Sequence, residues 1–136
     1  MTIHSERVFI DWVVGVLTAG GLIVGDAKAP TNPPANTGYV VVYSIAGGNT
    51  SGPLETPRSD AAPTFQVTSV SSDPRQCRWL VDRVRSLFNV AVPASLSGGR
   101  RVIWLDFPMS SVSVIRDDDV SPPTWYAPDR FEVGTV

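Results

Sequence analysis

The sequence predicts an α+β fold, in which a mostly antiparallel sheet carries two helices packed on one face. Two segments, near residues 6–19 and 74–88, have the apolar periodicity of amphipathic helices. The other apolar segments are short and bounded by Gly, Pro and Ser, as strands are. Their order is a helix, three strands, a helix and a further run of strands, which implies one helical layer on one sheet. The 136 residues allow one core, so we expect a single domain over residues 1–136.

The first predicted helix spans Glu6 to Ala19. Ser5 is suited to cap it, because its hydroxyl can accept the free backbone N–H groups of the first turn. Apolar side chains recur every three or four positions, which predicts one wide buried face. Gly20 and Gly21 are expected to end the helix, and a short strand from Leu22 to Val24 should follow.

Two strands are predicted before the second helix, each after a long loop. Residues 29–38 contain three prolines, which remove backbone donors and exclude a helix or a central strand. Gly38 to Ile45 is apolar on both faces, as expected inside a sheet. Residues 47–63 form a loop longer than an ordinary connection, and such loops are usually functional or mobile. Thr64 to Val70 then alternates between apolar and polar positions, which predicts a half-buried strand.

The second predicted helix has the clearest start signal in the chain. Asp73 is expected at the N-cap, Pro74 at the first helical position and Gln76 three residues beyond the cap, which is the pattern of a capping box. From Cys77 to Phe88 the apolar residues follow one helical face. Three more strands are predicted after it, over Arg101–Phe107, Val112–Arg116 and Arg130–Thr135.

The composition disfavours most catalytic functions, so we expect no enzyme and no cofactor. The chain has one His, one Cys and a net charge of −2, which leaves little for acid–base chemistry or for general nucleic-acid binding. The glycine spacing of Gly20 to Gly25 resembles a phosphate loop, but Asp26 stands where the lysine is required. His4 is expected to be a solvated terminal residue, and Cys77 a small core residue.

Neither a metal site nor a membrane span is expected. Asp117 to Asp119 is the one carboxylate cluster, but adjacent residues of an extended chain point to alternate sides and do not surround an ion. The apolar stretch from Val8 to Val24 is short for a spanning helix and is interrupted by Asp11 and by Gly20-Gly21.

The outer surface of the second helix is the main candidate for a subunit contact. The arginines predicted on this surface or at its flank are Arg75, Arg78, Arg83 and Arg85. Like charges three residues apart repel mildly and contribute little to the stability of a monomer. The pattern is typical of a solvated helix face or of an intersubunit contact made by bidentate pairing. For the second case the complement would be the acidic turn of Asp117, Asp118 and Asp119.

Trp125 and Tyr126 are a second candidate for an interface. They lie between Pro122-Pro123 and Pro128, in a segment that the prolines keep extended. A monomer would be expected to bury both aromatic rings. If they stand exposed they are candidate interface anchors, because Trp, Tyr and Arg dominate binding hot spots.

Several of these segments together resemble one protein family. The segment TFQVTSV and the following QCRWLVDRVR, residues 76–85, resemble the strand–helix core of the tail terminator (tail-completion) proteins of long-tailed actinobacterial bacteriophages. The stretch RDDDVSPPTWYAPDRFEV, residues 116–133, strengthens the resemblance, as do residues 38–45 and Gly52-Pro53-Leu54. Together these segments cover well over half of the chain.

The resemblance implies a small, ring-forming α+β subunit of the virion. A tail terminator assembles in the host cytoplasm as a hexamer on the head-proximal end of the tail tube. Its ring ends polymerisation of the major tail tube protein and offers the surface to which the neck and head–tail connector proteins attach. DNA would pass through the bore without being bound specifically, and the family brings no catalytic residue, cofactor or metal.

Three other functions are considered: a neck or head–tail connector protein, which the sequence barely separates from a terminator, and two that fit less well, a cellular protein-interaction domain and a small hydrolase. A neck or head–tail connector protein would share the ring habit but bind the portal-side assembly. A cellular protein-interaction domain would explain the same surfaces without a phage context. A small hydrolase would need a nucleophile and a base, and the sequence offers no such pair.

Overall fold

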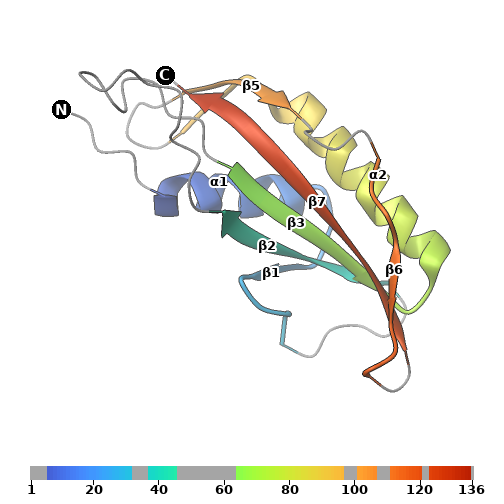
Figure 1. Ribbon diagram of the computed structural model, residues 1–136. Coiled ribbons are helices and arrows are strands. Elements are labelled where there is room, and N and C mark those ends of the chain that lie inside the picture. Colours follow the sequence, from blue (N-terminus) through green and yellow to red (C-terminus); the bar gives the residue numbers. More distant parts are fainter. Residues whose placement is uncertain are drawn as a thin grey trace, which may run out of the picture.

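The computed structural model of the chain describes residues 6–31, 37–45, 64–96, 101–106, 111–120 and 123–135 (Figure 1). His4, Ser5, residues 47–63 and the middle of the predicted loop 29–38 lie outside these ranges. The elements are α1 (Glu6–Ala19), β1 (Val24–Asp26), β2 (Tyr39–Ile45), β3 (Thr64–Ser71), α2 (Pro74–Ala91), β4 (Ala94–Ser95), β5 (Arg101–Asp106), β6 (Ile115–Asp117) and β7 (Thr124–Thr135).

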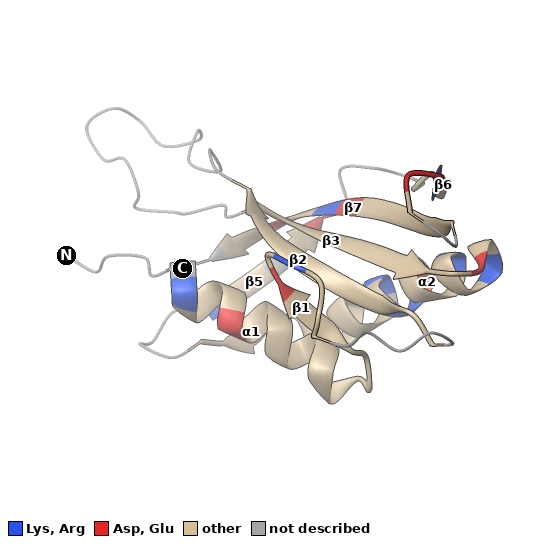
Figure 2. Ribbon diagram, turned by 90° about the horizontal axis from the view of Figure 1, so that it is seen from below, with Lys and Arg blue, Asp and Glu red and all other residues tan. Residues whose placement is uncertain are grey.

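The strands form one mixed sheet in the order β1-β2-β3-β7-β5-β4, and β6 also pairs with β7. The β1–β2 pair is parallel, and the other pairs are antiparallel. β7 is the longest strand: β3 runs along one of its edges, while β6 and β5 pair with the start and the end of the other edge. Both helices lie on the same face of this sheet (Figure 2). The predicted α+β architecture is therefore confirmed.

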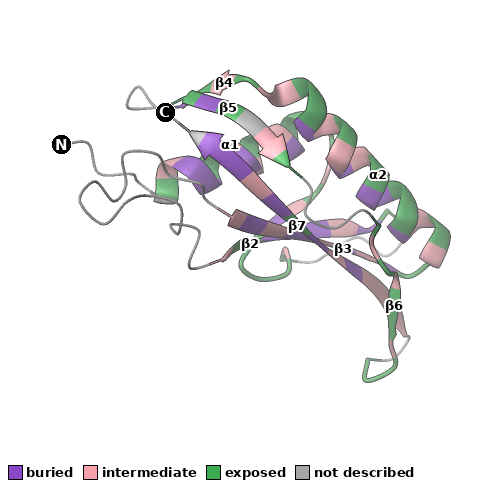
Figure 3. Cartoon of the chain, turned by 45° about the horizontal axis from the view of Figure 1, so that its top comes forward, coloured by how far each residue is buried: buried purple, intermediate pink, exposed green. Residues whose placement is uncertain are grey.

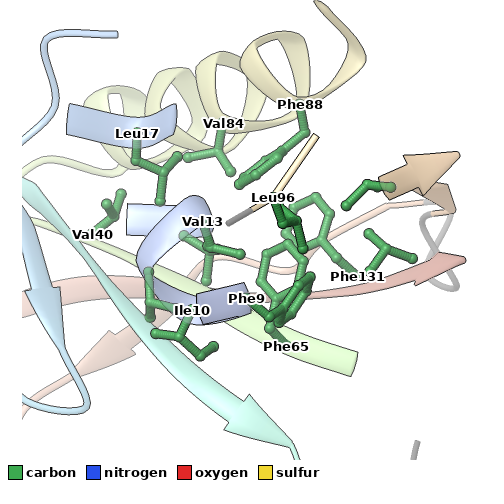
Figure 4. Packing of buried hydrophobic residues seen from close by; sticks show 14 of the residues in the cluster. Phe9, Ile10, Val13, Leu17, Val40, Phe65, Val84, Phe88, Leu96 and Phe131 are labelled. Atoms are coloured by element: carbon green, nitrogen blue, oxygen red, sulfur yellow. The ribbon is translucent and has the colours of Figure 1, made fainter. Parts of the chain in front are cut away.

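The core fills the space between the two helices and the sheet (Figure 4). β3 alternates strictly between buried and half-buried residues, because successive side chains of a strand point to opposite faces. Four phenylalanines from four elements meet at its centre. The rings of Phe65 and Phe131 are stacked with centroids 4.9 Å apart, and Phe9 and Phe88 contact Phe65 at 5.5 and 5.3 Å. Aromatic pairs at these distances add to the free energy of burial.

The first predicted strand begins later than expected, at Val24 instead of Leu22. The end of α1 uses the intervening residues, since the N–H of Leu22 donates to the carbonyl of Leu17 and Gly21 has a φ of 87°. β2 likewise begins at Tyr39, because Gly38 adopts a φ of 71° in the turn before it.

The predicted strand Val112–Arg116 is also shifted, to Ile115–Asp117. Val112 and Val114 are not in a strand, and both pack against a small apolar cluster beneath α2. β4 is not among the strands that the sequence predicts, and its two residues pair with β5.

The last strand begins six residues earlier than predicted, at Thr124 instead of Arg130. The sequence predicts only an extended segment before Arg130, but Pro128 lies within β7, where β7 pairs with β3 between the stretches that pair with β6 and β5. A missing N–H is tolerated where a strand edge has no pairing partner. Trp125, Tyr126 and Asp129 are therefore strand residues.

Neither helix of the described chain combines the length and the apolarity that crossing a membrane requires.

Candidate interaction surface

The start of α2 is fixed by the cap that the sequence predicts, with one difference. The Asp73 carboxylate accepts a hydrogen bond from the N–H of Arg75 at 3.3 Å. The Ser71 hydroxyl lies between the two ends of the predicted capping box: it accepts from the N–H of Asp73 at 3.2 Å and donates to the Gln76 side chain at 2.6 Å. These bonds hold the first turn of α2 against the end of β3.

One flank of α2 faces β7 and is closed by an internal ion pair. We call the residues Cys77, Val81 and Arg85 the β7-facing flank. The Arg85 guanidinium donates to both carboxylate oxygens of Asp129, with N–O distances of 2.7 and 2.9 Å. Asp129 is buried, with 2% of its surface exposed. Hydrogen bonding to this carboxylate raises the pKa of Arg85, although partial burial opposes the change.

Arg85 therefore does not lie on the fully exposed surface of the helix, where the sequence pattern predicted it. Its side chain is only 19% exposed and is committed to Asp129 within the same subunit. A carboxylate buried in a low-dielectric interior needs such a bidentate partner, because its desolvation is otherwise uncompensated.

The Cys77 thiol lies deeper on the same flank. It has no exposed surface, and its single S–H is shared between the carbonyls of Ser69 and Trp125, with sulfur–oxygen distances of 3.4 and 3.8 Å. Burial raises the pKa of the thiol to about 11, while the positive charge of Arg78 acts in the opposite direction. A buried, protonated thiol of this kind is not a nucleophile at neutral pH. Cys77 is a small residue of the core, as predicted.

Trp125 and Tyr126 point to opposite faces of the sheet, as neighbours in a strand must. Trp125 is half-buried and packs against Cys77, Val81 and Ala127 on the helix side. The Arg116 guanidinium lies 5.9 Å from the centre of its ring. The Trp125 ring is thus largely in contact with residues of its own subunit. Tyr126 lies half-buried on the face of the sheet that carries no helices.

The predicted acidic turn begins at the last residue of β6, Asp117, which is half-buried, and continues with Asp118 and Asp119, which are exposed. The N–H of Asp119 donates to the Asp117 carboxylate at 3.0 Å, which closes a local turn. Asp118 pairs with Arg116 at 2.7 Å, but both side chains are more than half exposed, so the pair contributes little to stability. Val120, at the end of this turn, has 43% of its surface exposed. We refer to residues 117–120 as the acidic turn.

The other three arginines have different environments. Arg75 and Arg78 are exposed, as the helical pattern predicts. Arg83 is half-buried and donates to the carbonyl of Gly20 at 3.2 Å, which ties α2 to the end of α1. Figure 2 shows positive positions along α2 and a negative segment at β6, the strand that pairs with the start of β7.

A second flank of α2 was missed by the sequence analysis. Trp79 has 56% of its surface exposed and is the most exposed aromatic side chain of the described residues. It lines a groove of about 260 Å³ between α2 and the chain that enters β1 and β2. We call this the β1-facing groove; it is lined by Gly21, Leu22, Ile23, Thr37, Gly38, Gln76, Trp79 and Leu80. Ile23, opposite Trp79 in the groove, is 41% exposed.

Two signals in the sequence could have found Trp79 and Asp129. On a helix whose core positions include Cys77 and Leu80, position 79 points away from the core, so an apolar residue there is out of pattern. Asp129 lies between Ala127 and Phe131 in the alternation of β7, which places a carboxylate on the buried face.

The described residues contain no group of three or more His, Cys, Asp or Glu side chains that could hold a metal ion. The described surface presents an exposed tryptophan between Arg75 and Arg83 on α2, and exposed carboxylates in the acidic turn after β6. Figure 3 shows the exposed outer side of α2 and the exposed course of β6.

No protein-family model and no curated protein matches this sequence. Solved structures do match, and one of them has 18% sequence identity, with 94% of this chain and 89% of its own covered and a TM-score of 0.48. A likeness at this level carries no argument about function. What the chain does must be inferred from its own residues.

Proposed function

We propose that this protein is a structural subunit of a long-tailed bacteriophage, a tail terminator whose ring caps the tail tube. The observation that carries the proposal is the outer side of α2. It holds the sequence QCRWLVDRVR on which the resemblance to tail terminators rests, and it presents Trp79, 56% exposed, between Arg75 and Arg83. Exposed Trp and Arg residues are the side chains that dominate the energy of protein–protein contacts.

Assembly explains why these residues are exposed. Several large apolar side chains have more than a third of their surface in contact with solvent, among them Trp79, Ile23, Ile115 and Val120. Apolar side chains that cluster at a surface groove are typical of interfaces. In the proposed ring each subunit would cover part of this surface on its neighbour.

The ring would have three kinds of partner. Its subunits would contact one another, one rim would bind the major tail tube protein, and the other rim would bind the neck or head–tail connector proteins. DNA would pass through the bore without specific contacts, in keeping with a net charge of −2. The proposed role requires no catalysis and no cofactor, and places the protein in the virion.

The test is an assembly experiment with the purified chain. Light scattering coupled to gel filtration should give the mass of a closed ring, on the order of six subunits if the resemblance holds. Adding the ring to the polymerising tail tube protein of the same phage should stop growth, with images showing one ring at one end of each tube. A monomer at every concentration, or binding along the whole tube, would overturn the proposal. Binding to the portal-side assembly but not to tubes would indicate the connector function.

A further inference from the structure

The β1-facing groove is open and its walls are apolar, although arginines flank it. Trp79 and Leu80 of α2 form one wall, and Leu22 and Ile23 form the other. The groove can receive one small aliphatic side chain, since its volume of about 260 Å³ exceeds that of a valine or leucine side chain. An exposed tryptophan beside such a groove loses further water when a partner covers it.

The charges around the groove favour an acidic partner. Arg75 and Arg83 lie four residues before and after Trp79, so all three share one side of α2. Arg83 uses one hydrogen bond to reach the Gly20 carbonyl beside the groove, and a guanidinium has five N–H donors. The capping residue Asp73, at the start of the helix, reduces this positive charge without removing it, whereas Asp82 lies near the middle of α2 and lines a pocket on the other flank with Arg78 and Arg85.

The acidic turn has the complementary composition. It presents exposed carboxylates at Asp118 and Asp119 and an exposed valine at position 120. Its internal pair with Arg116 is exposed, so exchanging that partner for another arginine costs little. An aliphatic side chain flanked by carboxylates matches an apolar groove flanked by guanidinium groups.

The two features lie at opposite edges of the same sheet. The groove adjoins β1, the outermost strand at one edge. The acidic turn follows β6, which pairs with β7 on the side away from β3. One subunit cannot bring the two together, but two copies placed side by side can. A contact between different surfaces of identical subunits is heterologous, and it repeats around a ring when the rotation closes.

We infer that the β1-facing groove binds the acidic turn of a second copy of this chain. Val120 of the neighbouring copy enters the groove beside Trp79 and Ile23, and its carboxylates pair with Arg75 and Arg83. The contact forms the centre of a larger interface, since stable interfaces bury about 800 Å² per partner and their energy concentrates in a few central residues. The inference rests on the proposed function in one respect, that copies of the chain assemble.

The experiment uses two variants that each damage one surface. Trp79→Glu places a carboxylate in the groove, and Val120→Asp places one on the side chain that should enter it. Each variant alone should self-associate at least about tenfold more weakly than the unchanged protein, as the loss of a central contact predicts. Matched controls are Val90→Glu on α2, at a site 87% exposed and outside the groove, and Ile103→Asp on β5, at a site 43% exposed. Circular dichroism establishes that all four fold.

Mixing the two variants gives the decisive measurement. Trp79→Glu keeps an intact turn and Val120→Asp keeps an intact groove, so an equimolar mixture should form pairs with the affinity of the unchanged contact and should stop at pairs. Gel filtration with light scattering measures both properties. If both single variants assemble normally, or if mixing restores no pairs, the assignment of these two surfaces to each other is wrong although assembly itself stands. If the unchanged protein is monomeric throughout, the proposed function fails as well.

Discussion

Arg83 and Arg85 lie two positions apart on α2, and their side chains leave the helix on opposite flanks. Arg85 makes two hydrogen bonds to a carboxylate that is almost completely buried. Arg83 makes one hydrogen bond to the backbone carbonyl of Gly20, the residue before Gly21 in the wall of the open β1-facing groove. The guanidinium on the β7-facing flank is therefore paired within the subunit, whereas at the β1-facing groove the described part of the chain leaves Trp79 56% exposed.

The difference separates two uses of the same residue type. Where a guanidinium meets a buried carboxylate, removing it leaves a charge in a medium that cannot solvate it. Where it meets a carbonyl at the surface, water can replace it at little cost. Arg83 and Arg85 are placed symmetrically about Val84 in the sequence, but the free-energy costs of removing the two guanidinium groups differ. Substitutions that change one flank and leave the other intact test this difference.

The largest effect is expected on the β7-facing flank. Arg85→Met keeps the aliphatic part of the side chain but leaves the Asp129 carboxylate buried and unpaired, which should lower the free energy of unfolding by about 3–5 kcal/mol. Urea denaturation followed by circular dichroism measures the loss. A loss below about 1 kcal/mol would show that Asp129 has another way to be solvated.

Two further variants separate the ion pair from the packing around it. Adding Asp129→Leu to Arg85→Met removes the stranded charge and should recover much of the loss, because a buried ion pair is often replaceable by apolar side chains. Arg78→Met, at an exposed site on the same helix, should change the stability by no more than about 0.5 kcal/mol.

The next effect is a loss of stability at alkaline pH, from the thiol on the same flank. Burial raises the pKa of Cys77 from an ordinary value of 9.0 to about 11. As the pH rises through 9 the unfolded thiol ionises first, which favours unfolding until the folded thiol ionises near 11. The protein should therefore lose about 2–3 kcal/mol between these pH values, measured by urea denaturation at a series of pH values.

The control for this loss is Cys77→Ala, which should flatten the pH dependence over the same range. The Tyr39 phenol also has a pKa raised by burial, and it contributes a loss in the same direction. Both measurements are therefore made in a Tyr39→Phe background. If the slope persists in the Cys77→Ala variant, the thiol is not its source.

The helices could be predicted from the sequence because their signals are local. Asp73 and Pro74 mark the start of α2, and the spacing of its apolar residues marks the face that is buried. Strand limits depend on neighbours, which a local pattern does not contain. The first six residues of β7 are a strand because β3 and β6 pair with them, in spite of Pro128. β1 has only three residues, and such a short segment contains no sequence signal for its parallel pairing with β2.

The candidate surface could be predicted only in part, for a related reason. Periodicity gives the direction of each side chain around α2, and Arg75 and Arg78 are exposed as expected. It does not give the element beside each flank, and the partner of Arg85 lies 44 residues further along the chain. Trp79 points outward by the same periodicity, but its groove exists only because residues 21–23 return to the side of α2.

The smallest expected effect lies on the β1-facing flank. Arg83→Met removes one hydrogen bond, of 3.2 Å, to the carbonyl of Gly20 at the end of α1. Because the site is half-buried and the carbonyl can be reached by water, the free energy of unfolding should fall by about 0.5–1 kcal/mol in urea denaturation. Beside Arg85→Met it is a matched comparison, with the same substitution two positions away on the same helix. If the free energy of unfolding falls as much as in Arg85→Met, Arg83 is needed for folding in the same way as Arg85. The groove beside it would then be a structural part of the subunit and not a surface that binds a partner.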